Sequence, residues 1–365
     1  MSLAAAIEPP ALISQSAQPA LAAEHAPPTC SYCGSHDFAP LYGGIRDRLG
    51  FVPGEWSFVR CADCGSAQLR PFPRAEDLGA FYPPVYTFSP ELAKSTLQRL
   101  LATLEYRLFF RPMYRAQVRL VDRRVRERGQ KPGRLLDLGC GRGLRLVDFR
   151  DRGYDVRGMD FVPDAVSYVR ETLGIPAVCT TPAGLPDHYE PESFDVITAF
   201  HVVEHLTDPD VALAAVHRLL KPGGWLAIAG PLLDSLQARS FGARWTAVTE
   251  APRHVTIPSR AGLKKLCIAA GFDPTSLAVA PDAALSCSSV YALSKFPSGA
   301  STAAYGTARK WAAATRILAA AATLLAAPLA WFENHIGGRP ALGIVFARKP
   351  LRSLSSNLSS NSSLS

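Results

Sequence analysis

The sequence predicts an α/β fold with a doubly wound, mostly parallel sheet, and two observations support this. Residues 135–138 form a short apolar run that contains Asp137, and glycine then occupies every second position through Gly143. A second apolar run follows at residues 154–159 and ends in Asp160, seventeen residues beyond Gly143. This interval accommodates one helix and one strand, which is the order of a βαβ unit in a nucleotide-binding fold.

The glycine-rich loop is expected to bring bare backbone against a ligand, before a helix that begins at about Leu144. Asp160 lies where such folds place the acid that binds a ribose. A tight turn and a solvated strand end would explain the same residues without a ligand, but the second acid in register favours a nucleotide-type ligand. The candidate cofactor-binding residues are Asp137, Gly139, Cys140, Gly141, Gly143, Asp160, Phe161 and Phe200.

The acid inside the first strand indicates which nucleotide to expect. A dinucleotide site keeps an apolar strand end and needs a third glycine three residues after the second. This chain has Asp137 two residues before Gly139, and its third glycine, Gly143, comes two residues after Gly141. A carboxylate there would repel a pyrophosphate but attract the ammonium group of S-adenosylmethionine. The carboxylate of that ligand can accept backbone N–H groups at the helix start.

At this point the chain resembles the class I S-adenosylmethionine-dependent methyltransferases. Residues 135–143 match their first motif, hh-D-x-G-x-G-x-G, in full. The later sequence motifs of the family, FDV…EHL.DP…LLKPGG, are present between Phe194 and Gly224. The resemblance covers residues 115–275. It implies a doubly wound, mostly parallel seven-stranded Rossmann-like methyltransferase sheet, with S-adenosylmethionine as cofactor.

The segments around these motifs predict the remaining elements of the core. Residues 193–200 are expected to form the fourth strand. The segment from His201 opens a helix whose apolar side is expected to carry Val211, Leu213, Ala214, Val216, Leu219 and Leu220. A glycine turn ends that helix before a buried strand at residues 225–231. A further helix over residues 260–270 is ended by glycine.

The resemblance implies methyl transfer by in-line displacement, for which the protein aligns the reactants and supplies a base to a hydroxyl acceptor. The fourth strand ends at the edge where doubly wound sheets keep their sites. His205 is the first candidate base, with Glu204 orienting it or helping to bind a cation. His201 and His254 are further candidates, and Arg253 could meet an anionic acceptor group or cap local carbonyls. A structural role for His205, fixing the loop at a helix start, is the alternative.

Two cysteine pairs near the N-terminus predict a structural zinc site. Cys30-x2-Cys33 and Cys61-x2-Cys64 are separated by 27 residues, and a glycine follows each pair. Four thiolates at this spacing suit tetrahedral zinc, and the small residues leave backbone N–H groups free to point at sulfur. Two disulfides are the alternative, but they need an oxidising compartment that the N-terminal sequence does not indicate.

A proline-aromatic connector follows the predicted zinc ribbon and includes Tyr82 and Tyr86. From the cysteines to these tyrosines, the sequence pattern is similar to that of bacterial methyltransferases with an N-terminal zinc ribbon. Many of those enzymes tailor sugars, polysaccharides or glycolipids, so the resemblance implies an acceptor of this kind. The tyrosines either contact the substrate or pack the ribbon onto the core.

The net charge of +8 is concentrated ahead of the core, where residues 91–131 contain eleven Lys or Arg and four acids. Five arginines at steps of four form a stripe on one helix face: Arg107, Arg111, Arg115, Arg119 and Arg123. Such a helix can be a solvated face, contact a membrane surface or bind nucleic acid. Few aromatic residues are interleaved for base stacking. The fourth strand also lacks the Asn/Asp-Pro-Pro-aromatic motif that methylates base amines, so nucleic acid is not favoured.

An apolar segment near the C-terminus favours membrane contact. From Ile317 to Trp331 the chain has fifteen uncharged residues, which is short for a bilayer span, and Pro328 lies among them. Tryptophans at its ends suit an interfacial or re-entrant segment, and a buried helix or a dimer contact is the alternative. Residues 341–348 resemble the last strand of the sheet, so residues 285–340 would be an apolar helical insertion near the acceptor.

The 365 residues are expected to contain several units. These are a disordered tail (1–28), a zinc ribbon (29–70), a connector and basic helix (71–130), a methyltransferase core (131–284), the apolar insertion (285–340), the last strand (341–350) and a second tail (351–365). The first tail lacks the basic start of a secretory signal, so we expect a cytoplasmic protein, working at the inner face of the membrane if it contacts one.

Together these features predict an S-adenosylmethionine-dependent methyltransferase that acts on a hydroxyl of a sugar, polysaccharide or lipid-linked acceptor. The expected partners are a small-molecule or lipid-linked glycan and a membrane surface, with no nucleic acid. An RNA methyltransferase and a non-catalytic membrane-associated binding protein are the alternatives.

Overall fold

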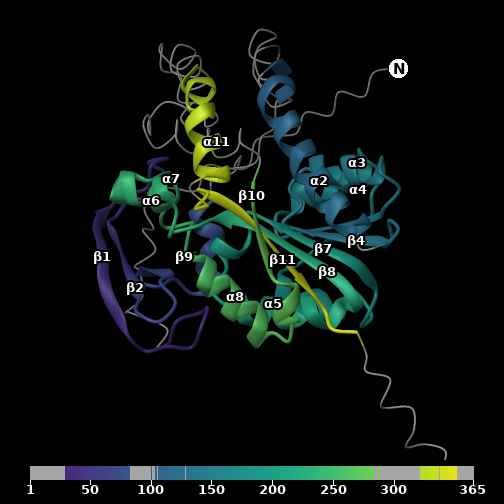
Figure 1. Cartoon of the computed structure of the whole chain (residues 1–365), viewed down its shortest axis with the longest axis horizontal. Helices are drawn as coiled ribbons and strands as arrows, with labels where there is room; N and C mark the ends of the chain where they lie inside the picture. The colour runs from purple at the N-terminus through teal and green to yellow at the C-terminus, as the bar shows by residue number, and fades with distance from the viewer. Residues whose placement is uncertain are drawn as a thin grey trace, which may run out of the picture.

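The computed structural model describes residues 29–82, 100, 103–104, 106–127, 129–282, 287, 321–336 and 338–351. A large sheet lies at the centre, a smaller sheet from the N-terminal part lies beside it, and two helical segments project beyond one end (Figure 1). The predictions for the two tails, for Tyr86 and for most of the apolar insertion lie outside the described residues.

The central sheet has the strand order β10-β11-β8-β7-β4-β5-β6. Its strands are β4 (Arg134–Leu138), β5 (Asp155–Asp160), β6 (Ala177–Cys179), β7 (Phe194–Phe200), β8 (Leu220–Pro231), β10 (Ala278–Pro281) and β11 (Leu342–Arg348). The five strands from β8 to β6 are parallel, whereas β11 runs antiparallel to both β8 and β10. The predicted doubly wound, mostly parallel seven-stranded sheet is confirmed. Because β4 lies between β5 and β7, the carboxyl ends of these strands enclose the switch point where such sheets bind ligands.

Helices cover both faces of this sheet. The longer ones are α2 (Arg111–Arg126), α3 (Leu144–Arg150), α4 (Pro163–Glu171), α5 (Pro209–Leu219) and α8 (Arg260–Ala269). The shorter ones are η1 (Ala75–Phe81), η4 (Pro182–Asp187), η5 (Val203–His205), α6 (Leu236–Phe241), η6 (Gly242–Arg244), α7 (Thr246–Thr249) and η7 (Pro274–Ser276).

The helix after the fourth strand differs from the prediction in two ways. It begins at Pro209, because the tight turn η5 separates it from the strand that ends at Phe200. Of the residues expected on its apolar side, Leu213, Val216 and Leu219 are buried, whereas Val211 is 49% exposed and Ala214 is exposed as well.

The smaller sheet joins the N-terminal part of the chain to the core. It contains β1 (Phe38–Ile45), β2 (Trp56–Cys61) and β3 (Ala67–Arg70), which pair antiparallel. A fourth strand, β9 (Thr256–Ile257), pairs with β3 although it follows the fifth parallel strand of the core in sequence. The predicted ribbon therefore shares a sheet with a loop of the core and is not a structurally separate domain.

The two projecting segments include the predicted basic helix and part of the predicted insertion. The turn η3 (Tyr106–Phe110) leads directly into α2, and α11 (Ala327–His335) precedes β11. Leu325, Leu329 and Trp331 are 82%, 49% and 52% exposed, so the described part of the apolar segment is not the buried helix named as an alternative. Among the described residues, every helix is too short or too polar to cross a bilayer.

Candidate active site

The glycine-rich loop between β4 and α3 has a backbone that side chains disfavour. Gly139, Gly141 and Gly143 have φ angles of 60°, 52° and 69°, which lie in the left-handed region. A Cβ atom at Gly139 would lie 2.6 Å from Val202 Cγ2, and one at Gly143 would lie 2.8 Å from Leu173 Cδ1. Conformation and space therefore both require glycine at these two positions.

Asp160, at the end of β5, is tied to this loop. Its Oδ2 accepts the N–H of Gly141 at 2.8 Å, and its Oδ1 accepts the N–H of Val162 at 2.9 Å. Burial raises the pKa of this carboxyl, against the lowering effect of its backbone hydrogen bonds. Each carboxylate oxygen keeps a further acceptor position. Asp160 can therefore accept ligand hydroxyls while it holds the loop in place.

Asp137 is buried inside the sheet and accepts a hydrogen bond from Thr198 Oγ1 at 2.6 Å. Burial raises its pKa to about 6, although the charge of Arg145 and the Thr198 hydroxyl oppose the rise. The carboxyl is thus mostly ionised at neutral pH. The Arg145 guanidinium also lies 4.6 Å from the ring centroid of Phe200.

Two of the predicted cofactor residues, Phe200 and Cys140, are also buried in the core. Phe200 is 3% exposed, and the Arg145 guanidinium lies over its ring. Cys140 is 6% exposed, and its N–H donates to the Met159 carbonyl at 2.9 Å. Phe161, by contrast, is 48% exposed beside Asp160.

The segment after β7 places an acid between histidines. His201 has a φ of 59°, unusual for a residue with a side chain, and its N–H donates to the Ala229 carbonyl at 2.7 Å. Its Nδ1 lies 3.4 Å from Oε1 of Glu204, whose side chain is 1% exposed. Burial alone would raise the pKa of Glu204, but the hydrogen bond and charge of His201, with the nearby imidazoles, hold it at about 2.

His205 and His254 meet edge to face, with ring centroids 4.7 Å apart. His205 Nδ1 lies 3.0 Å from the Arg253 carbonyl, and His254 Nδ1 lies 2.8 Å from the Ala247 carbonyl. Because a carbonyl only accepts, these contacts place each proton on Nδ1 and leave Nε2 with a lone pair. Burial lowers the pKa of both rings, that of His254 to about 4, so both are neutral at pH 7.

These side chains line one cavity of about 210 Å³. Its walls are His201, Glu204, His205, Pro231, Thr246, Ala247, Glu250, His254 and Leu342. All four predicted catalytic residues are therefore brought together from two loops. Glu204, His205 and His254 also offer one ligand atom each within 4.8 Å of one another, a set that could hold a cation. The neutral imidazoles of His205 and His254 lie beside the ionised carboxylate of Glu204, and this arrangement is suited to proton transfer.

The comparison with known proteins agrees with this arrangement. A family described as "Methyltransferase domain" matches residues 109–277, which include the glycine loop, Asp160 and the histidine-lined cavity. Residues 109–277 are similar to this family and are called the methyltransferase domain after that match.

The methyltransferase domain also resembles characterised proteins over part of their length. The ubiquinone biosynthesis O-methyltransferase of Paraburkholderia phymatum is 34% identical over 104 residues, which are 26% of this chain and 42% of the relative. That of Pseudomonas syringae pv. tomato is 35% identical over 112 residues, 30% of this chain and 47% of the relative. The chain thus matches less than half the length of these relatives. A solved structure, a putative sarcosine dimethylglycine methyltransferase from Galdieria sulphuraria, aligns with a TM-score of 0.46 and 17% identity over 64% of this chain and 85% of its own.

Tyr82 reaches the methyltransferase domain from the connector that follows the small sheet. Its hydroxyl lies 2.9 Å from His205 Nδ1, and its ring packs edge to face against Phe161 at 5.4 Å. One side chain thus contacts both the base candidate and the residue that follows Asp160. The aromatic residues of the connector indicated that Tyr82 makes a contact of this kind. The sequence alone did not distinguish contact with the substrate from packing against the core.

Arg253 is wholly buried, which contradicts the predicted contact with an anionic acceptor and leaves it one carbonyl contact beside two ion pairs. Its guanidinium pairs with Asp47 at 2.5 Å and with Glu250 at 3.0 Å, and it donates to the Phe81 carbonyl at 3.3 Å. It therefore meets neither an anionic acceptor nor carbonyls alone, because two carboxylates already neutralise it. No sequence pattern indicated Asp47, which follows β1 of the small sheet and binds the methyltransferase domain through Arg253.

The four N-terminal cysteines converge as predicted. Cys30 Sγ lies 3.6 Å from Cys64 Sγ, Cys33 Sγ lies 3.6 Å from Cys61 Sγ, and all four sulfurs are within 4.8 Å of one another. No disulfide joins them, so the alternative pairing is wrong for this structure. The glycines that follow each pair have left-handed φ angles of 74° and 75°. A tetrahedral donor set of four thiols on two glycine turns fits zinc.

Proposed function

We propose that this protein is an S-adenosylmethionine-dependent methyltransferase that acts on a hydroxyl of a sugar, polysaccharide or lipid-linked acceptor. One observation carries the proposal. The loop bound by Asp160 and the cavity that contains His205 lie at the carboxyl ends of neighbouring strands of one parallel sheet. A donor site and an acceptor site are therefore adjacent.

The donor half rests on the residues that end β4 and β5. Asp137 carries negative charge at neutral pH, which suits an ammonium group, and Asp160 has acceptor positions for ribose hydroxyls. The left-handed loop leaves no side chains at Gly139 and Gly143. When bound, S-adenosylmethionine supplies a methyl group that is already activated, so the protein needs only to align the acceptor and accept its proton.

His205 is the proposed base of this reaction. It is neutral at pH 7, its Nδ1–H is held by the Arg253 carbonyl, and its Nε2 is available to accept a hydroxyl proton. Glu204 stays ionised beside it and favours the imidazolium that proton uptake would create. His254 and His201 complete the polar wall of the cavity.

Oxygen as the methyl acceptor is supported by the relatives, whose names describe O-methyltransferases. The glycan or lipid character of the acceptor rests on the resemblance of the zinc ribbon and connector to sugar- and glycolipid-tailoring enzymes. We further propose that Cys30, Cys33, Cys61 and Cys64 bind a structural zinc ion, since a closed set of four thiolates leaves no open position for chemistry.

The experiment that tests the function is methyl transfer from labelled S-adenosylmethionine into separated lipid, polysaccharide and RNA fractions. Label in the lipid or polysaccharide fraction is expected, and label in RNA alone would overturn the acceptor class. In parallel, calorimetry should show that Asp160→Asn weakens donor binding about 10- to 100-fold. Asp164→Asn, an exposed acid four residues away, is the matched control. Absence of donor binding by the intact protein would leave the non-catalytic binding protein as the interpretation.

A further inference from the structure

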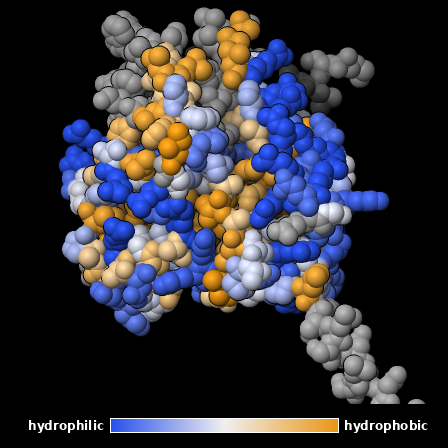
Figure 2. All heavy atoms as spheres, viewed as in Figure 1, coloured by the Kyte–Doolittle hydropathy of each residue, from blue (hydrophilic) through white to orange (hydrophobic). Residues whose placement is uncertain are grey.

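Apolar side chains gather on the two segments that project from one end of the molecule. The exposed fractions are 57% for Leu108 on η3, 82% for Leu325, 52% for Trp331 and 47% for Phe332. Both segments rise beyond the same end of the sheet (Figure 1), and Figure 2 shows hydrophobic atoms on that end. Soluble monomers seldom expose contiguous apolar surface of this kind unless something binds it.

The orientation of α11 is held by buried polar contacts on its other side. Gln237 of α6 donates to Glu333 from its N–H at 3.1 Å and from its Nε2 at 2.9 Å. Asn334 Nδ2 donates to the Asp282 carbonyl at 3.2 Å, and both Glu333 and Asn334 are buried. Because the polar side of α11 is anchored, Trp331 and Phe332 are exposed on the helix, and Leu325 is exposed just before it.

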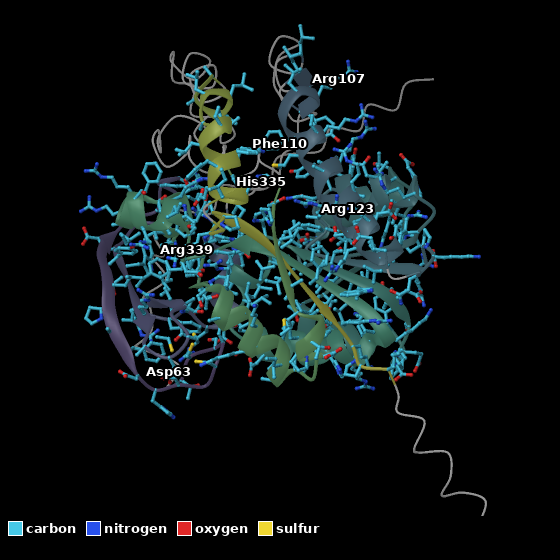
Figure 3. All side chains as sticks on the ribbon, viewed as in Figure 1. Asp63, Arg107, Phe110, Arg123, His335 and Arg339 are labelled. Carbon is cyan, nitrogen blue, oxygen red and sulfur yellow. The ribbon has the colours of Figure 1, made fainter. Side chains whose placement is uncertain are left out.

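Positive charge flanks this apolar end. Arg107, Arg111 and Arg119 are exposed on η3 and α2, the segment that also carries Leu108, and Arg107 lies near the upper end of that segment in Figure 3. Apolar side chains beside exposed arginines suit the interface of a bilayer with anionic headgroups. Neither the length of α11 nor that of α2 permits a span, so the contact is at the surface.

The apolar end is connected to the histidine-lined cavity. Leu342, at the start of β11, is a wall of the cavity and follows α11 by a few residues. Gln237, which anchors α11, lies on α6, shortly before the cavity residues Thr246 and Ala247. A surface bound by α11 would therefore lie close to the acceptor cavity.

We propose that this apolar end docks on the surface of an anionic lipid bilayer, with Leu108, Leu325, Trp331 and Phe332 inserted below the headgroups and the arginines on the phosphates. Docking does not depend on methyl transfer. Its consequence, that acceptors enter the cavity from the bilayer, rests on the proposed function.

The test is co-sedimentation of the full-length protein with vesicles of phosphatidylcholine alone and with added phosphatidylglycerol. The protein should bind the anionic vesicles and be released by salt. Leu325→Glu and Trp331→Glu should each weaken binding by about tenfold or more, because each removes one inserted side chain. Reversing Arg107, Arg111 and Arg119 to glutamate should remove the preference for anionic vesicles.

Matched controls lie at other parts of the molecule. Leu351→Glu changes a leucine that is 67% exposed beyond β11, and Lys264→Glu changes an exposed lysine on α8; neither should alter vesicle binding. Donor binding by calorimetry should be the same in every variant, which separates docking from the proposed activity. Equal loss in the controls, or no binding of the intact protein to anionic vesicles, would overturn the proposal. Light scattering that shows a dimer which Leu325→Glu dissociates would replace the membrane with a second copy of the chain.

Discussion

The hydroxyl of Tyr82 lies 2.9 Å from Nδ1 of His205, although 123 residues separate them. We expect Tyr82→Phe to lower kcat about three- to tenfold, because His205 loses one partner that orients its ring. Donor affinity should stay near that of the wild type, since the phenyl ring can still pack on Phe161. Steady-state kinetics check this. Tyr154→Phe, which removes a 3.1 Å hydrogen bond to Asp122 away from the cavity, is the control and should leave kcat unchanged.

The histidines predict how the protein responds to acid. The pKa of His205 is lowered by burial, so activity should persist below the usual histidine pKa of about 6.5 and fall as pH drops through the lowered value. His254 stays neutral in the folded state down to about pH 4, while the unfolded chain takes up that proton near pH 6.5. The unfolded state therefore binds more protons in this window, and stability should decrease from pH 6.5 toward 4.

Profiles of kcat/KM and of Tm against pH measure these two effects separately. Glu204 remains ionised throughout, because its pKa is about 2. Divalent ions can also be removed while zinc at the four cysteines is retained. Full loss of activity would then contradict the role of His205 as a base and indicate that Glu204, His205 and His254 bind a cation.

Gly139 should tolerate no side chain. Gly139→Ala introduces a Cβ 2.6 Å from Val202 Cγ2 at a φ of 60°, so donor binding should be lost and stability reduced. Gly174→Ala is the matched control, because its φ is 62° but a Cβ there meets no atom within 4 Å. That variant should lose only about 1–2 kcal/mol from the left-handed backbone and keep donor binding. Calorimetry measures donor binding by the two variants, and thermal unfolding measures their stability. Equal losses in both variants would show that backbone strain, and not the contact with Val202, causes the effect.

The buried ion pairs of Arg253 should matter more than any exposed pair. Arg253→Met leaves Asp47 buried without its cation and Glu250 with Arg48 alone, and should destabilise the fold by about 3–5 kcal/mol. Arg260→Met removes a half-exposed pair with Asp234 and should cost no more than about 1 kcal/mol. Denaturant unfolding of both variants tests this, and similar losses would argue against tight coupling of the small sheet to the methyltransferase domain.

Zinc should stabilise the ribbon without taking part in the reaction. Cys33→Ser and Cys61→Ser should each abolish stoichiometric zinc in the purified protein, measured by elemental analysis, and lower the Tm. Cys179→Ser, at an exposed cysteine outside the cluster, should change neither. Because β3 pairs with β9 next to the cavity, zinc loss should also weaken acceptor binding more than donor binding. Retention of zinc in the Cys33 and Cys61 variants would refute the site.

Local sequence patterns were sufficient to predict the strands and helices around the proposed donor site. The bounds of β4, β5 and α8 and the start of α3 were predicted to within one or two residues, because strand ends, glycine turns and helix stops are properties of short segments. The cysteine spacing likewise predicted the cluster, since each CxxC-G turn folds locally. The contact of Arg145 with the ring of Phe200 was not predicted, because no local pattern specifies it.

The sequence by itself determined the class of the fold, the donor loop with Asp160, and the four thiols, because each is specified by backbone geometry or ligand spacing within one short stretch. Only the tertiary structure decided that Tyr82 contacts His205 and that Arg253 is neutralised by Asp47, 206 residues away. It alone also decided that β9 extends the ribbon sheet and that the apolar face of α11 points outward. These relationships depend on which surfaces meet after folding. Burial then keeps His205 and His254 neutral, and the neighbouring histidines keep Glu204 ionised.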